Sequence, residues 1–173
     1  MSININGKND LNGRYKMPKV RINVAGKGNG KFTMIRNLND ISKSVGHPES
    51  LLLKFIGVSL NCNSNEEKIS ITGHYSEKDI QDKINLYNQM YVLCPTCNLP
   101  ELTPEVIGKK KRKGIQVKCS ACGSTNKLLS DNKDFDKGLK NLIIHIEKNG
   151  WTTVKGTMVE SKKESNNPFE KIF

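Results

Sequence analysis

The chain has 173 residues, of which 28 are lysine or arginine and 17 are aspartate or glutamate, so its formal net charge is +11 at pH 7. This length suffices for one modest domain and a second, small one that a metal ion stabilises. No apolar run approaches the roughly 18 residues that cross a bilayer, so we expect no membrane partner. The charge favours phosphate-rich partners, because neutralising phosphates releases their counterions, although solubility explains it equally well.

The amino-terminal segment, residues 1–13, is polar and rich in glycine and asparagine, which predicts a flexible arm. Beyond Pro18, apolar residues alternate on both sides of the glycine loop Gly26–Gly30 and predict the two half-buried strands of a hairpin. The alternating residues are Val20, Ile22 and Val24 before the loop, and Phe32 and Met34 after it.

Apolar residues recur at helical spacing in four later segments, near residues 38–45, 48–56, 80–91 and 134–148. Pro48 is placed to open the second of these helices, and Ser76 and Asp79 form a capping-box-like start to the third. Between the second and third helices, Ile69 and Ile71 predict a further strand.

Four cysteines form two C-x₂-C turns separated by 21 residues; they are Cys94, Cys97, Cys119 and Cys122. Each turn presents two thiolates at the span of one metal ion, so the pattern predicts a closed tetrahedral site for one structural zinc. Two disulfides or four unrelated thiols are the alternatives. Because no apolar leader directs the chain to an oxidising compartment, we favour zinc, a cytoplasmic location, and a bystander role for the fifth cysteine, Cys62.

The sequence therefore predicts an α+β fold. A small mixed α/β domain, residues 14–92, is expected to precede a Cys₄ zinc ribbon of β-hairpins, residues 93–130. A C-terminal helix over residues 131–149 is expected to pack on the ribbon or on the first domain. The remaining residues, 150–173, are expected to form a partly disordered tail.

Arg14 is the first candidate functional residue. It lies between Gly13 and Tyr15, at the end of the predicted arm, where it can be presented outward to a partner. A guanidinium is always charged, and its planar fork matches phosphate oxygens, which lets an arginine supplied in trans stabilise the charge that develops during GTP hydrolysis. The commoner alternative is a solvated surface arginine.

Two basic segments are candidates for contacts with RNA. The glycine loop offers Lys27, Gly28 and Asn29 for close approach to a phosphate backbone, but it lacks the spacing of a P-loop, so we expect no nucleotide site there. The expected tip of the ribbon hairpin consists of Lys109, Lys110, Lys111, Arg112 and Lys113. A simple turn and a solvated hairpin tip are the respective alternatives.

No Ser-His-Asp or Cys-His arrangement, and no carboxylate pair with an evident role, is present in the sequence. We therefore expect a protein that is not a self-contained enzyme.

Several motifs, in their order and spacing, resemble the amino-terminal domain of the eukaryotic translation initiation factor 5 family. They are Arg14–Pro18, Gly26–Gly30, Lys54-Phe55-x-Gly57, Gln81-Asp82 and the two C-x₂-C turns. The resemblance covers about residues 1–148 and implies an α/β domain joined to a zinc ribbon. In the family, a linker and a carboxy-terminal helical-repeat domain normally follow. The resemblance therefore leaves two expectations open, a fragment of a longer factor or a naturally reduced factor.

The resemblance implies a factor that stimulates GTP hydrolysis by the gamma subunit of initiation factor 2 and helps monitor start-codon recognition. Its implied partners are that subunit with GTP, the initiator tRNA, the small ribosomal subunit and mRNA. By position, Arg14 matches the arginine finger of the family and Lys54 a lysine implicated in the same activity. A further such lysine stands in the family where this chain has Phe32; here Lys31 comes one residue earlier, which along a strand points the charge to the opposite face.

Two other functions remain open. The beta subunit of initiation factor 2 shares the architecture, but it needs an amphipathic helix ahead of the shared domain, which thirteen polar residues do not supply. A zinc-ribbon adaptor that binds RNA without affecting hydrolysis is the second alternative. The stretch 61–68 departs from the family, since Glu66 and Glu67 stand where a basic RNA-contacting loop is expected.

Overall fold

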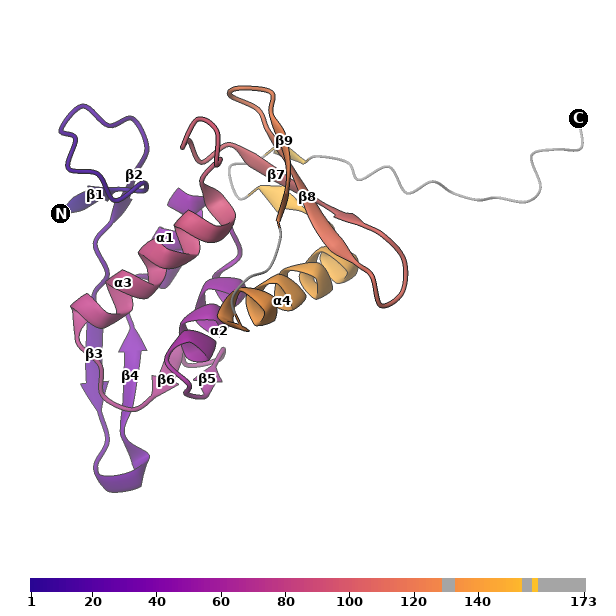
Figure 1. The fold of residues 1–173 in the computed structure, drawn as a ribbon. Helices are drawn as coiled ribbons and strands as arrows, with labels where there is room; N and C mark the ends of the chain where they lie inside the picture. The colour runs from indigo at the N-terminus through magenta and orange to yellow at the C-terminus, as the bar shows by residue number, and fades with distance from the viewer. Residues whose placement is uncertain (129–132, 154–156, 159–173) are drawn as a thin grey trace, which may run out of the picture.

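The computed structural model describes residues 1–128, 133–153 and 157–158, and most of the expected tail lies outside these residues. The predicted α+β class is confirmed: a mixed α/β unit is followed by an antiparallel ribbon and a long helix (Figure 1). Within the described residues, no helix has the length and apolar character that a membrane crossing requires.

The amino-terminal segment is not the flexible arm expected over residues 1–13. Strand β1, Ser2–Asn4, pairs antiparallel with β2, Lys16–Pro18. Directly after β1, Ile5 is 2% exposed, and Met17 on β2 is fully buried. The expectation was wrong because it rested on the polar composition of the segment, whereas strand pairing and the burial of Ile5, with Ile3 packed beside the core, dock it.

A four-stranded antiparallel sheet forms the base of the α/β unit. Its strands are β3, Ile22–Ala25; β4, Phe32–Ile35; β5, Ser64–Asn65; and β6, Ser70–Thr72, in the spatial order β3-β4-β6-β5. The predicted hairpin around the glycine loop is confirmed, with a 3₁₀ turn at Gly28–Gly30. The predicted face of β4 is wrong: Thr33 and Ile35 are buried, while Phe32 and Met34 are only partly covered, because Thr33 gives its hydroxyl to the Gly73 carbonyl at 2.8 Å.

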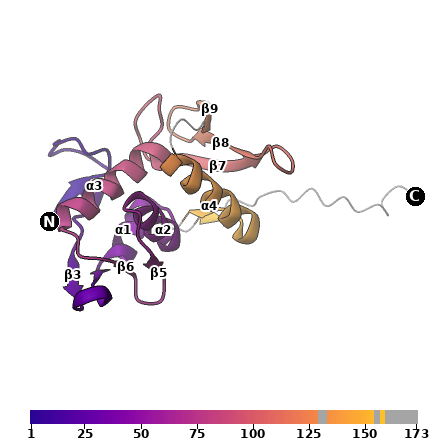
Figure 2. The ribbon, with the colours of Figure 1, turned by 60° about the horizontal axis from the view of Figure 1, so that its bottom comes forward.

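Three helices pack with this sheet around one apolar core. They are α1, Leu38–Val45; α2, Glu49–Ser59; and α3, Glu77–Tyr87, which continues into a π-helical turn, Asn88–Val92. The predicted starts hold, since Pro48 precedes α2 and the Ser76–Asp79 capping box opens α3. Figure 2 shows α1 and α2 side by side beneath α3, and α2 contributes four of the fully covered core residues: Leu52, Leu53, Phe55 and Ile56.

The ribbon is a three-stranded antiparallel sheet in the order β7-β8-β9. Its strands are β7, Leu102–Ile107; β8, Gly114–Cys119; and β9, Thr125–Leu128. The predicted C-terminal helix is present as α4, Lys133–Asn149, and it contacts both α2 and the ribbon strands β7 and β8. A Cβ at Gly138 would lie 2.3 Å from the Tyr91 hydroxyl, so glycine at this position is what lets α4 approach so closely.

After α4 the chain returns to the α/β unit. Trp151 is 6% exposed, and its ring meets that of His47 edge-on at a centroid distance of 4.7 Å. His47 is buried as well, with Nδ1 at 2.8 Å from the Tyr87 hydroxyl. A short hairpin follows, formed by β10, Thr152–Thr153, and β11, Thr157–Met158.

Candidate functional site

The four cysteines of the C-x₂-C turns come together at the base of the ribbon. Their sulfur atoms all lie within 4.8 Å of one another. The Sγ atoms of Cys94 and Cys122 are 3.7 Å apart, and those of Cys97 and Cys119 are 3.6 Å apart. Sulfurs bound to one tetrahedral zinc at about 2.3 Å stand about 3.8 Å apart, so this donor set fits a closed thiolate metal site.

The two C-x₂-C turns have the same backbone geometry. The Asn98 N–H donates to the Cys94 carbonyl at 2.8 Å, and the Gly123 N–H donates to the Cys119 carbonyl at 3.0 Å. Both donors adopt left-handed backbone, with φ of 58° at Asn98 and 73° at Gly123. Two matching turns that face each other present four thiols from two directions, as a tetrahedral site requires.

Local hydrogen bonds favour the thiolate form at Cys94. Its burial opposes a negative charge, but contacts with the Ser124 hydroxyl and with the backbone N–H groups of Cys97 and Thr96 outweigh it and lower the pKa of Cys94 to about 6. Ser124 Oγ also lies 3.0 Å from Cys122 Sγ, and this contact lowers the pKa of Cys122. A metal ligand must be deprotonated, so these hydrogen bonds favour cation binding at Cys94 and Cys122. Cys97 differs, since burial raises its pKa to about 12.

Arg14 lies on the loop between β1 and β2, and its side chain is exposed. Its neighbours on both sides are held by backbone hydrogen bonds. The Gly13 N–H donates to the Asp10 carbonyl at 3.2 Å, and the Tyr15 carbonyl accepts from the Ile5 N–H at 3.0 Å. The structure therefore presents Arg14 from a folded loop rather than from the flexible arm that its sequence context indicates.

Asn4 supports this loop from inside. It is 8% exposed, and its Nδ2 donates to the carbonyls of Lys8 and Asp10, both at 2.6 Å. A Cβ at Gly13 would lie only 2.3 Å from Asn4 Oδ1, so position 13 has no room for a side chain. No sequence pattern pointed to Asn4, since its partners are backbone carbonyls of an irregular loop.

Tyr15 connects the Arg14 loop to the ribbon. Its hydroxyl donates to Glu101 Oε1 at 2.7 Å, across 86 residues of sequence. This hydrogen bond, together with burial, raises the pKa of Tyr15. A depression of about 300 Å³ lies alongside, lined by Arg14 and Tyr15 and by residues 98–100 of the first cysteine turn. The structure thus brings Arg14 next to the base of the ribbon.

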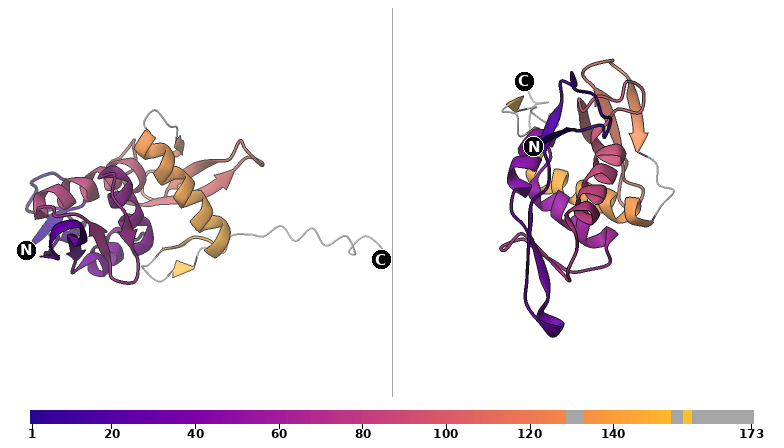
Figure 3. Two further views of the ribbon diagram at one scale, coloured as in Figure 1. Left: turned by 90° about the horizontal axis from the view of Figure 1, so that it is seen from below. Right: turned by 90° about the vertical axis from the view of Figure 1, so that its left-hand side faces the viewer.

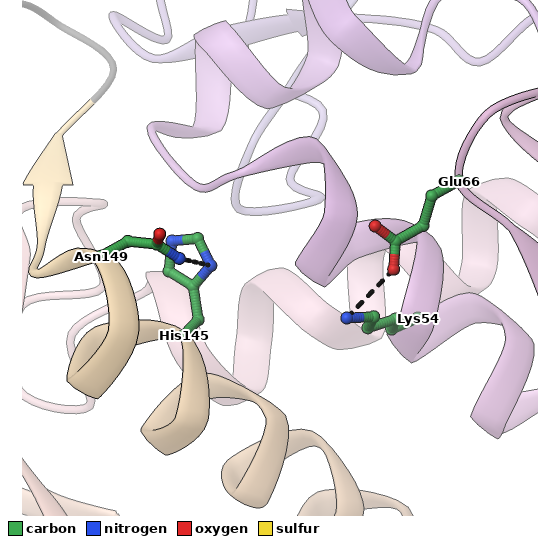
Figure 4. Close-up of polar contacts among 4 residues, drawn as sticks. All are labelled: Lys54, Glu66, His145 and Asn149. Atoms are coloured by element: carbon green, nitrogen blue, oxygen red, sulfur yellow. Dashed lines mark hydrogen bonds and ion pairs between the residues drawn. The ribbon is translucent and has the colours of Figure 1, made fainter.

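Lys54 lies on the outer face of α2, where its Nζ is 3.0 Å from Glu66 Oε1. Figure 4 shows the two side chains pointing toward each other, and His145 on the facing helix α4 close to Asn149. Asn149 Nδ2 is 3.3 Å from His145 Nδ1, and burial together with the positive charge of Lys54 lowers the pKa of His145. Glu66, which departs from the family pattern, thus pairs with Lys54, which agrees with that pattern.

The glycine loop lies far from Arg14. Lys27, Gly28 and Asn29 are exposed at the turn between β3 and β4. In Figures 1 and 3 this turn projects from one end of the α/β unit, and the β1–β2 loop lies at the opposite end. Lys31 is exposed in extended backbone directly before β4, so it alternates with Phe32 and shares the face of Thr33.

The basic cluster of residues 109–113 occupies the predicted tip between β7 and β8. All five side chains are exposed. Lys113 forms an ion pair with Glu147 of α4, which leaves its charge partly compensated. The other four basic residues, Lys109, Lys110, Lys111 and Arg112, are exposed in the turn that joins β7 to β8.

The fold and the cysteine cluster define a class of protein in which an α/β domain is joined to a β-ribbon that carries four clustered cysteines. A family model, described as a domain found in initiation factors 2B and 5, matches residues 6–125. The chain therefore belongs to the family that carries this domain, and its resemblance to the amino-terminal domain of initiation factor 5 is confirmed.

Curated relatives agree with the family model. The chain is 33% identical over 146 residues to eukaryotic translation initiation factor 5 of Mus musculus, a match that covers 82% of this chain and 34% of the relative. It is 38% identical over 112 residues to the factor of Dictyostelium discoideum, covering 64% and 28%. The probable factor of Schizosaccharomyces pombe is 34% identical over 114 residues, covering 64% and 28%. The matched part of the chain thus spans about a third of the length of these relatives.

Proposed function

We propose that this protein is a cytoplasmic translation initiation factor that stimulates GTP hydrolysis by the gamma subunit of initiation factor 2 in the ribosomal pre-initiation complex. We further propose that it helps monitor start-codon recognition in that complex. The family and the names of the relatives support a role in initiation. The observation that carries the activating role is the exposed Arg14, presented from a loop whose two flanking residues are hydrogen-bonded.

In this mechanism Arg14 enters the nucleotide site of the partner. Its guanidinium donates to phosphate oxygens on which negative charge grows as the terminal phosphoryl group leaves. An arginine supplied in this way accelerates hydrolysis by about 10³- to 10⁵-fold. The GTP, its metal ion and the attacking water belong to the partner, so this chain acts as an activator rather than as an enzyme.

Two lysines are assigned to the same contact. Lys54 carries the charge that the family pattern places on α2. In this chain its ion pair with Glu66 has to break before Lys54 can contact the partner. Lys31 lies on the opposite face of β4 from position 32, so we expect Lys31→Ala to lower the stimulated rate less than Lys54→Ala does.

The basic segments are assigned to RNA. We propose that Lys27, Gly28 and Asn29 approach the backbone of the initiator tRNA, where glycine lets the chain come close. The ribbon tip, residues 109–113, is assigned to phosphates of the small ribosomal subunit or mRNA. The two segments lie on different parts of the molecule, so they contact different stretches of RNA.

Zinc is the metal that we propose for the cysteine site. Cys94, Cys97, Cys119 and Cys122 supply four thiolates at tetrahedral separations, which leaves no position for a substrate. The ion stabilises the ribbon, whose own apolar core is small, and it takes no part in hydrolysis.

Single-turnover GTP hydrolysis in reconstituted initiation complexes tests the proposal. Wild-type protein should accelerate hydrolysis, Arg14→Ala should lose the acceleration, and Arg14→Lys should lose most of it, because an ammonium lacks the bidentate fork. Arg36→Ala, at another exposed arginine, is the matched control and should behave as wild type. Unchanged rates with Arg14→Ala would contradict the activating role.

Two other outcomes would point to other functions. An RNA-binding adaptor is favoured by the two exposed basic segments, and it would bind initiation complexes without changing the rate of hydrolysis. A subunit resembling initiation factor 2 beta would instead copurify stably with the gamma subunit alone.

A further inference from the structure

We propose that Tyr15 and Glu101 are positioning residues, through which the ribbon holds Arg14 in the conformation that reaches a partner. The inference rests on the proposed function of Arg14, and it adds a role for the ribbon that requires no contact between the ribbon and the GTPase.

The ribbon side of this link is rigid. Glu101 directly precedes β7, and its carbonyl accepts a hydrogen bond of 3.0 Å from the N–H of Ser120, inside the second cysteine turn. The next residue, Leu102, is opposite Cys119 in the β7–β8 register and is 7% exposed. The backbone of Glu101, whose carboxylate receives the Tyr15 hydroxyl, is therefore held by the segment that carries the thiols.

The other side of Arg14 is fixed independently. Gly13 lies against the buried side chain of Asn4, which is bonded to two carbonyls of the same loop. Arg14 thus lies directly between Gly13, which is packed against Asn4, and Tyr15, which is hydrogen-bonded to the ribbon. Rotation of the loop at Tyr15 would break the hydrogen bond to Glu101, and rotation at Gly13 would disturb its packing against Asn4.

Such anchoring should affect the rate of GTP hydrolysis in the bound complex rather than the binding of this protein to its partner. A preorganised arginine loses less conformational entropy when it enters a nucleotide site, and a displacement of about 1 Å in such a group costs up to about 100-fold in rate. Loss of the Tyr15–Glu101 bond should therefore lower the maximal stimulated rate and leave the half-saturating concentration of this protein unchanged.

Backbone dynamics test the anchoring without any GTPase. In the wild-type chain the ¹⁵N order parameter of the Arg14 amide should be near 0.85, the value of rigid backbone, and in Tyr15→Phe it should fall toward about 0.6. Glu101→Ala should have the same effect. Glu101→Gln keeps an oxygen acceptor and should remain near wild type. The matched control is Glu105→Ala, which removes an exposed carboxylate from the same ribbon strand.

Kinetics with the same variants test the consequence. Tyr15→Phe and Glu101→Ala should each reduce the maximal stimulated rate about tenfold, and the double variant should be no slower than either single one, since all three lack one bond. Circular dichroism and metal content should remain as in the wild type.

The outcomes separate this inference from the proposed function. A rigid Arg14 amide and a rate within about twofold of wild type in Tyr15→Phe would overturn the inference, even if Arg14→Ala abolishes stimulation. A mobile Arg14 amide in Tyr15→Phe would support the anchoring of Arg14 even if Arg14→Ala left the stimulated rate unchanged. That second result would contradict the proposed function, and the expected effect of anchoring on the rate would fail with it.

Discussion

Lys54 and Glu66 form an ion pair of 3.0 Å between α2 and the turn that joins β5 to β6, with side chains 44% and 51% exposed. The pair places a carboxylate against a lysine to which we assign a role in GTPase activation. An exposed pair of this kind contributes only about 0.2–1 kcal/mol, so Glu66 moderates Lys54 without sequestering it.

Glu66→Gln should therefore raise the stimulated GTPase rate by up to about fivefold at low salt, because Lys54 no longer has to leave a partner. The gain should shrink as salt screens the pair. Glu67→Gln, at the neighbouring exposed carboxylate, is the control. Equal rates for both variants at all salt concentrations would exclude a role for the pair.

Gly13→Ala should destabilise the folded chain by about 1–3 kcal/mol, because the new methyl group would overlap Asn4 Oδ1. Thermal or urea unfolding measures the loss. Gly30→Ala is the matched control, since a Cβ there has nothing within 4 Å. A wild-type midpoint for Gly13→Ala would mean that the loop relaxes freely around Asn4.

Removal of the metal should unfold the ribbon from about Leu93 to Leu128, because its folding free energy comes from metal binding. Hydrogen exchange should show loss of protection in β7, β8 and β9 after chelation, with release of one zinc per chain. Cys119→Ser should have the same effect in the absence of chelator. Persistent protection of these strands without metal would refute the zinc assignment.

Charge removal at the ribbon tip should weaken RNA binding in a salt-dependent way. Replacing Lys110 and Lys111 together by alanine should reduce the slope of log affinity against log salt by about 1.4–1.8, since each phosphate contact contributes about 0.7–0.9. Replacing Lys43 on α1 and Lys78 on α3 together by alanine, at two exposed lysines, is the matched control for net charge. An unchanged slope in the double variant would contradict the RNA contact and indicate that the tip is only a solvated hairpin end.

Buried His47 should make stability depend on pH. Burial, aided by the positive charge of His145, lowers its pKa to about 3, below its ordinary value of 6.5. As the pH falls below about 6.5, His47 is protonated in the unfolded chain while it stays neutral in the folded chain. The free energy of unfolding is therefore highest above about pH 6.5 and falls by about 1.4 kcal/mol per pH unit toward pH 3. His47→Gln should flatten this fall, and the His47 ring signals should not titrate above pH 4 in NMR spectra. If the free energy of unfolding depended on pH equally in the wild type and in His47→Gln, this role of His47 would be contradicted.

Local patterns in the sequence were sufficient for most of the fold. Helical spacing located α1 to α4, and the capping residues Ser76 and Asp79 located a helix start, because both signals lie within a few residues. The cysteine spacing located the ribbon and its four thiols for the same reason. Composition failed for the amino-terminal segment, which docks through the pairing of β1 with β2 and the burial of Ile5.

The supporting contacts of the candidate site could not be predicted in this way. Tyr15 and Glu101 are 86 residues apart, and neither has a local partner that signals the bond. Glu66 departs from the family pattern, but its distance from Lys54 depends on how the β5–β6 turn packs beside α2. Contacts of this kind follow from tertiary packing, which periodicity and spacing do not encode.

The close approach of α4 at Gly138 has a mechanical consequence. Because this helix touches α2 on one side and strands β7 and β8 on the other, the ribbon cannot swivel unless α4 slides off Tyr91. Reorientation of the ribbon therefore requires α4 to repack against α2 as well as against β7 and β8.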